Sequence, residues 1–262
     1  MKKYSSRRFF FKKPVRSIVQ LLFLVVFVFL VRVLWGAAGA HNLCPWALVE
    51  VPALMLSLKV GIFFVGGIIL GIIGIAATLF YPRPFCGWVC PLGTLFDFLG
   101  DLGKKIGFSA KQIPHWLNEK LRFFSYGVLG ILVIMTFLTK RLVCIYGCPA
   151  FWICSAGRIA VPIITIVILA AVFILSLRVK RGFCRYICPY GALTALFVPL
   201  SMKKVRGNLE VCISCRICSK ACPMGIDFLH DFDVNSAHCI SCGECIDSCP
   251  KRTLFWGNRR DS

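Results

Sequence analysis

VCISCRICSKACP (residues 211–223) and HCISCGECIDSCP (residues 238–250) decide the fold of the C-terminal part of this chain. Each stretch has the spacing C-x2-C-x2-C-x3-C followed by proline, which is typical of a site that holds a pair of [4Fe–4S] clusters. Three thiolates on one tight loop reach three irons of a cubane, and the fourth, after a short helical step, reaches the other cluster. The spacing therefore predicts a bacterial-type two-[4Fe–4S] ferredoxin domain.

The exchange of the fourth cysteine predicts two ligand sets. The first set is Cys212, Cys215, Cys218 and Cys249, and the second is Cys239, Cys242, Cys245 and Cys222. Pairs of the C-x2-C type also bind zinc, so a pair of zinc knuckles is the alternative. Here each half supplies a third and a fourth cysteine at ferredoxin spacing, with proline after the last, which favours two [4Fe–4S] clusters.

The composition is that of a membrane protein. Of the 262 residues, 58% are hydrophobic, and the mean hydropathy is +0.78. The net charge of +20 could indicate nucleic-acid binding. However, the basic residues flank apolar spans, so the excess of positive charge on cytoplasmic loops explains them better and no nucleic-acid partner is expected. Sixteen cysteines in such a chain favour metal ligation over a disulfide scaffold.

Four apolar spans are expected to cross the membrane, at residues 18–35, 60–80, 123–138 and 159–177. The basic tail (1–17) and the basic loops after the second and fourth spans place both termini in the cytoplasm. We therefore expect a mostly α protein of the cytoplasmic membrane, multi-pass, with a four-helix membrane domain (18–200) and a cytoplasmic ferredoxin domain (201–262). A cleaved signal peptide ending near residue 40 is the alternative for the first span.

A repeated motif, F-C-x3-C-P-x-G-x-L, begins at Phe85 and again at Phe183. Such a repeat indicates two halves related by a pseudo-twofold axis. Cysteines four residues apart on a helical turn face the same way, so the two motifs could together form a four-thiolate site from Cys86, Cys90, Cys184 and Cys188. A further iron–sulfur cluster or metal, redox-active thiols, and a structural role all stay open for this inner quartet.

Four more cysteines fall in the expected outer loops, and one pair repeats the C-x3-C-P spacing. They are Cys44, Cys144, Cys148 and Cys154. A metal or cluster site, disulfides, and passive packing are the open interpretations. Electrons cannot cross a core of about 30 Å in one useful step, so either cysteines on both sides or a quinone in the bilayer is needed. His41 and Glu50 are candidate proton acceptors for quinol oxidation, with simple solvation as the alternative.

FCGWVCP (85–91) and FCRYICPYGAL (183–193), placed among four spans and before the double cluster motif, resemble the NapH/MauN group of ferredoxin-type membrane proteins. The same signature occurs in the related NosR and RdxA/CcoG proteins. The resemblance implies an electron carrier or quinol dehydrogenase subunit that passes electrons between membrane quinol, or an external partner, and a redox partner protein. The alternative is a metal- or thiol-reducing maturation or sensor protein of the RdxA/CcoG or NosR kind. The outer cysteines depart from the usual NapH pattern.

Overall fold

The computed structural model describes residues 13–30, 44–49, 65–108, 115–139, 149, 163–207, 211–228 and 235–258. The described part is mostly helical. Five residues singled out above lie outside it: His41, Glu50, Cys144, Cys148 and Cys154.

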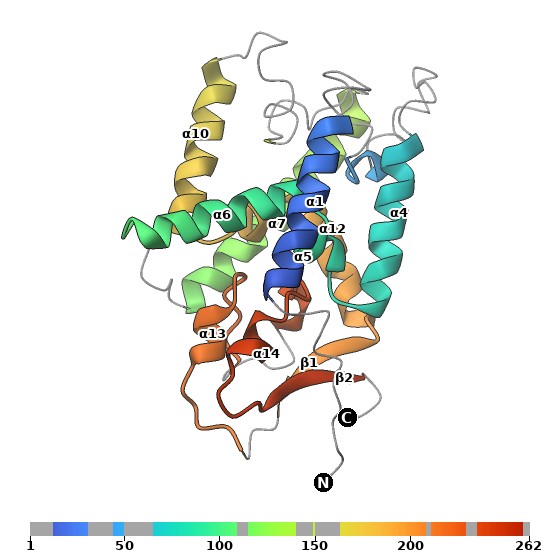
Figure 1. The fold of residues 1–262 in the computed structure, drawn as a ribbon. Helices are drawn as coiled ribbons and strands as arrows, with labels where there is room; N and C mark the ends of the chain where they lie inside the picture. Colours follow the sequence, from blue (N-terminus) through green and yellow to red (C-terminus); the bar gives the residue numbers. More distant parts are fainter. Residues whose placement is uncertain are drawn as a thin grey trace.

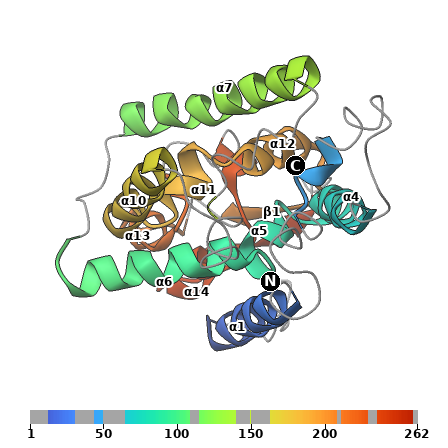
Figure 2. The same cartoon turned by 90° about the horizontal axis from the view of Figure 1, so that it is seen from above.

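Four long helices lie above the C-terminal domain: α1 (Lys13–Phe29), α4 (Val65–Phe80), α7 (His115–Thr139) and α10 (Ile163–Arg178) (Figure 1). α4 and α10 stand roughly upright, whereas α7 is strongly tilted (Figures 1 and 2). They correspond to the four expected spans. Within the described residues only 116–139 form a helix long and apolar enough to cross a membrane, whereas the apolar helices 15–29, 66–80 and 165–178 are shorter. The four-span bundle therefore stays a prediction.

Two helix starts differ from expectation. α7 begins at His115 rather than near residue 123, so the segment before the expected span also belongs to this helix. Its polar side chains Asn118 and Arg122 are buried because they bond to the C-terminal domain. α1 begins at Lys13, within the expected tail, because Arg16 is also held by buried partners.

The repeated motif has the same backbone in both copies. α5 (Pro84–Trp88) and α6 (Pro91–Lys105) follow α4, and α11 (Gly182–Tyr186) and α12 (Pro189–Phe197) follow α10, before the short 3₁₀ helix η4 (Val198–Leu200). Cys90 and Cys188 cap α6 and α12 with nearly equal angles (φ −62°, ψ 117° and φ −60°, ψ 114°). Proline follows each cap because the first helical position needs no N–H donor.

The two halves exchange contacts as a twofold axis requires. α6 of the first half packs on α10 of the second, and α12 packs on α4 in return, while α1 packs on α6 as α7 packs on α12. Seen from above, α1 and α7 lie on opposite sides, as do α4 and α10 (Figure 2). Phe85 packs on Tyr190 with ring centroids 5.8 Å apart, and Phe183 packs on Phe96 at 5.5 Å. The described part thus shows the expected pseudo-symmetry.

The C-terminal domain carries a second internal repeat. β1 (Lys203–Gly207) pairs antiparallel with β2 (Leu254–Asn258) and closes the domain. Between the strands lie α13 (Ile217–Ala221), the 3₁₀ helix η5 (Asn235–His238) and α14 (Glu244–Ser248). Ser214 and Ser241 occupy equivalent positions with φ 52° each. The domain core includes Met224, Ile226, Phe228, Ile240 and Leu254.

Candidate functional site

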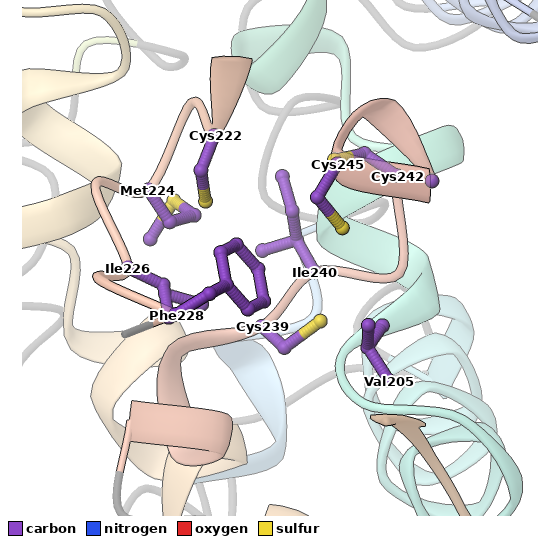
Figure 3. A pocket seen from close by; sticks show the side chains of 10 residues that line it. Val205, Cys222, Met224, Ile226, Phe228, Cys239, Ile240, Cys242 and Cys245 are labelled. Atoms are coloured by element: carbon purple, nitrogen blue, oxygen red, sulfur yellow. The ribbon is translucent and has the colours of Figure 1, made fainter. Parts of the chain in front are cut away.

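Four cysteines from both motifs line one pocket in the C-terminal domain. Cys239, Cys242 and Cys245 come from the second motif, and Cys222 comes from the end of the first (Figure 3). Apolar side chains complete the lining: Val205, Met224, Ile226, Phe228 and Ile240. This is the exchange of the fourth cysteine that a two-cluster ferredoxin needs. The second ligand set itself stays a prediction, and the pocket supports it.

Burial sets the chemistry of these thiols. It raises the pKa of Cys239 to about 12 and that of Cys242 to about 11. Buried thiolates are stable only beside a compensating cation, because isolated charge is expensive in an apolar interior. Thiolate ligation to iron supplies that compensation, so the donor set fits an iron–sulfur cluster. Among the described residues, no three His, Cys, Asp or Glu side chains form a site for a single metal ion.

The first ligand set lies on a more exposed loop. Cys215 is exposed, and the exposed fractions of Val211 and Ile213 are 53% and 57%. Cys249 reaches this loop from the second motif, since Cys218 has it as an electrostatic neighbour. Although burial acts in the opposite direction, hydrogen bonds from the side chain and backbone of Thr253 lower the pKa of Cys249, which favours the thiolate that binds iron.

The first membrane motif docks directly on the buried cluster loop. The Trp88 Nε1–H donates to the Ser241 carbonyl at 3.0 Å, and the Ser241 hydroxyl donates to the Pro82 carbonyl at 2.6 Å. Cys86 packs against the core of the C-terminal domain. A Cβ on Gly87 would lie 2.1 Å from the Ile240 carbonyl oxygen, so only glycine permits this approach.

Replacing Gly87 by alanine is expected to loosen this contact. The methyl group meets a backbone carbonyl that cannot rotate away, and overpacking of this kind costs about 1–3 kcal/mol. Thermal unfolding and limited proteolysis between the two domains measure the effect. Gly130→Ala is the matched control, because nothing lies within 4 Å of a Cβ at this position of α7. Equal stability of the two variants would contradict the docking.

A buried charged network ties the first half to the same loop. Arg16 of α1 donates to Asp97 at 2.5 Å and to Glu244 at 2.6 Å, and Arg181 donates to both Asp97 oxygens at 2.7 and 2.6 Å. Burial alone would raise the pKa of Asp97, but the charges and hydrogen bonds of Arg181 and the charge of Arg16 lower it to about 2. Neither Asp97 nor Glu244 was predicted as part of a site; the available signal for Asp97 was an acid in the mostly glycine-rich and apolar first turns of the helix after the first motif.

The second half holds the opposite side of the pocket. Arg122 of α7 donates to the carbonyls of Met224 and Gly225, and Asn118 also donates to Gly225. These contacts surround the segment just after Cys222. They were not predicted, because nothing local in the sequence of α7 indicates a partner about a hundred residues away.

The four cysteines of the inner quartet lie in one neighbourhood, contributed by both motifs. Electrostatic neighbours of Cys184 include Cys86, Cys90 and Cys188. Burial raises the pKa of Cys86 to about 11 and raises that of Cys184 well above its usual value. What the four cysteines bind stays a prediction.

Of the four cysteines expected in the outer loops, only Cys44 lies among the described residues. Its side chain packs against the buried pair Trp46 and Tyr190, against which Cys86 and Cys188 also pack. The turn that carries it approaches α4 closely, since a Cβ on Gly71 would lie 2.7 Å from the Pro45 carbonyl oxygen. The outer quartet stays a prediction, because Cys144, Cys148 and Cys154 lie outside the described residues.

Comparison with known proteins agrees with this geometry. The chain matches the family described as 4Fe-4S binding domain twice, at residues 62–109 and 161–207, and the 4Fe-4S dicluster domain at residues 204–250. MJ0750 of Methanocaldococcus jannaschii is 31% identical over 223 residues, which cover 83% of this chain and 85% of MJ0750. The chain belongs to the family of 4Fe-4S ferredoxin-type proteins.

Two further members of this family align with the chain over a smaller share of their own length. YccM of Escherichia coli is 32% identical over 58% of this chain and 44% of YccM. The methylamine utilization ferredoxin-type protein MauN of Methylobacillus flagellatus is 26% identical over 55% of this chain and 50% of MauN. The chain thus spans about half the length of these two relatives, and the resemblance to the NapH/MauN group is confirmed. No solved structure matches the chain.

Proposed function

We propose that this protein is a membrane-bound electron carrier with two cytoplasmic [4Fe–4S] clusters, held by the two ligand sets given above. One observation carries the proposal: Cys222 of the first motif shares a pocket with three cysteines of the second, and the loop of that pocket contacts the first membrane motif at Gly87. When bound, a [4Fe–4S] cluster supplies one-electron redox chemistry. The chain's own residues hold, bury and align the two sites.

Exposed apolar side chains support the proposed four-span membrane domain (18–200). They cover α1, α4, α7 and α10 with residues such as Leu22, Ile72, Phe123 and Ile166. Patches of this kind on long helices are typical of contact with lipid. The ferredoxin domain (201–262) and the N-terminal end of α1 lie at the same end of the molecule (Figure 1). Together with the basic tail (1–17), this supports cytoplasmic termini in a multi-pass protein of the cell membrane.

The burial of the two ligand sets supports an order for electron transfer. The exposed loop of Cys215 is accessible to a soluble redox partner protein, whereas the buried loop of Cys242 faces the membrane motifs. Beyond it, Cys86, Cys90, Cys184 and Cys188 are placed to hold a further cluster or metal, and membrane quinone is the proposed lipid-soluble partner. In this scheme Asp97 and Arg16 position the domains and do not react.

Iron and acid-labile sulfide on anaerobically purified protein, with EPR of the reduced form, test the proposal. We expect about eight irons per chain for the two ferredoxin clusters, and more if the inner quartet binds a cluster. In the second case, replacing Cys86 and Cys184 by serine returns the count to about eight. A chain with zinc and no sulfide would overturn the proposal.

The position of Cys44 favours a second candidate function. A third cysteine that packs against the same Trp46 and Tyr190 as Cys86 and Cys188 suits a protein that reduces a metal or a thiol of another protein, as the RdxA/CcoG resemblance implies. Loss of that reduction in a Cys44→Ser variant with unchanged iron content would identify this activity.

A further inference from the structure

Arg83 and Arg181 are equivalent residues of the two membrane repeats. Each lies three residues before the first cysteine of its motif, and each has a left-handed backbone, with φ 42° and 56°. Both side chains are buried, with exposed fractions of 3% and 0% for the whole residues. The repeat thus places two guanidinium groups in equivalent positions of one pseudo-symmetric frame.

Their partners are not equivalent. Arg181 is bound by both oxygens of Asp97 and by the Cys86 carbonyl. When the two repeats are aligned, Ala195 occupies the position of Asp97 in the second half. The carboxylate that neutralises Arg181 therefore has no counterpart for Arg83. Within the described residues, the Nε and Nη2 groups of Arg83 have no hydrogen-bond partner.

A buried guanidinium without a counter-ion is unfavourable. Removing one partner of a buried ion pair is strongly destabilising, because the remaining charge is neither hydrated nor paired. Arginine cannot escape this cost by losing its proton at ordinary pH. The position therefore calls for an anion, which no carboxylate of the described residues supplies.

The surroundings of Arg83 indicate which anion that is. Its electrostatic neighbours include Cys86, Cys188 and Cys239. These belong to the first membrane motif, the second membrane motif and the buried cluster loop. The adjoining Pro82 accepts a hydrogen bond from Ser241 of that same loop. Tyr126 and His238 are further titratable groups nearby, and among the described residues Arg83 forms no ion pair with a carboxylate.

We propose that Arg83 is the counter-cation of thiolate-ligated iron at the junction between the buried ferredoxin loop and the membrane motifs, and that it raises the reduction potential there. The inference rests on the proposed function, because it needs iron at this junction. An iron–sulfur cluster with cysteine ligands is anionic and gains one more negative charge on reduction, so a fixed nearby cation stabilises the reduced form more. The electron would thereby be drawn towards the membrane-facing site.

Redox titration followed by EPR tests the inference on the purified full-length protein. In Arg83→Gln we expect the midpoint potential of one centre to fall by about 59 mV, a tenfold change in the ratio of reduced to oxidised form at fixed potential. Arg83→Lys keeps the charge and should retain most of the wild-type potential. The cluster of the exposed Cys215 loop is the internal reference, because it should not shift. Its signal is assigned by its loss in a Cys215→Ala variant.

Two further variants identify which centre shifts and test the inference without altering Arg83. If the shift persists in a Cys86→Ser background, the centre is the buried ferredoxin cluster; if its signal disappears, the centre lies in the membrane motifs. Ala195→Asp offers Arg83 the carboxylate that Arg181 has, so it should lower the same potential with Arg83 intact. Unchanged potentials in both the Gln and the Asp variants, at unchanged iron content, would overturn the inference. Wild-type protein without iron would overturn the proposed function instead.

Discussion

Replacing Cys222 by alanine is expected to remove the cluster of the second motif, although Cys222 belongs to the first. The reason is the pocket that Cys222 shares with Cys239, Cys242 and Cys245. Iron per chain should fall from about eight to about four, with the EPR signal of one centre lost and the other kept. Removing Cys249 should produce the complementary loss, because this residue lies next to Cys218 of the first loop.

Double variants distinguish exchanged ligand sets from two separate four-cysteine sites. Cys222→Ala combined with Cys239→Ala removes two ligands of one cluster, so the loss should equal that of either single variant. Cys222→Ala combined with Cys218→Ala removes one ligand from each cluster, so almost all ferredoxin iron should be lost. The two pairs are matched in the number of cysteines removed. If the combination with Cys218 retained half the iron, each motif would hold its own four-cysteine site and the exchange would be wrong.

Replacing Asp97 by asparagine is expected to destabilise the protein by about 3–5 kcal/mol. Asp97 lies between the buried side chains of Arg16 and Arg181, so its neutral form leaves two guanidinium groups without their shared counter-ion. Because Arg16 also holds Glu244 at the start of α14, the docking of the ferredoxin domain should weaken too. Thermal unfolding in detergent and faster proteolytic release of the ferredoxin domain measure the two effects.

Asp101→Asn is the matched control on the same helix. Asp101 pairs with Lys180 at 3.0 Å, but its side chain is 57% exposed, and exposed pairs contribute about 0–1 kcal/mol. A loss as large as that of Asp97→Asn would show that any acid on α6 matters equally, which contradicts the network.

The low pKa of Asp97 predicts that the protein loses stability in acid. The pKa of this carboxylate in the folded protein is about 2, below the ordinary value of 3.8. The stabilisation is therefore present above about pH 4 and is lost as the pH falls towards 2, because the unfolded chain takes up the proton first. The free energy of unfolding of the wild type should therefore fall more steeply with decreasing pH in this range. The Asp97→Asn variant should lack this part of the pH dependence.

Much of this molecule follows from local sequence. The cluster loops depend on cysteine spacing over a dozen residues, and their turns are set by neighbouring residues such as Ser214 and Ser241. The repeated membrane motif likewise carries its own helix start, with Cys90 or Cys188 as the cap and proline next. Periodic patterns of this range can be recognised in a single chain because the residues that define them are adjacent. The apolar spans were recognised for the same reason, although α7 extends further towards its N-terminus.

The sequence by itself thus determined the cluster motifs, the internal repeats and the mostly helical architecture. Only the tertiary structure decided that Cys44 packs against Trp46 and Tyr190, that Asp97 neutralises Arg181, and that Arg83 has no such partner among the described residues. These facts depend on side chains that are distant in sequence and meet only when the two halves pack. Charge pairing in an interior of low dielectric is set by distance and burial, and neither can be obtained from residue types along the chain.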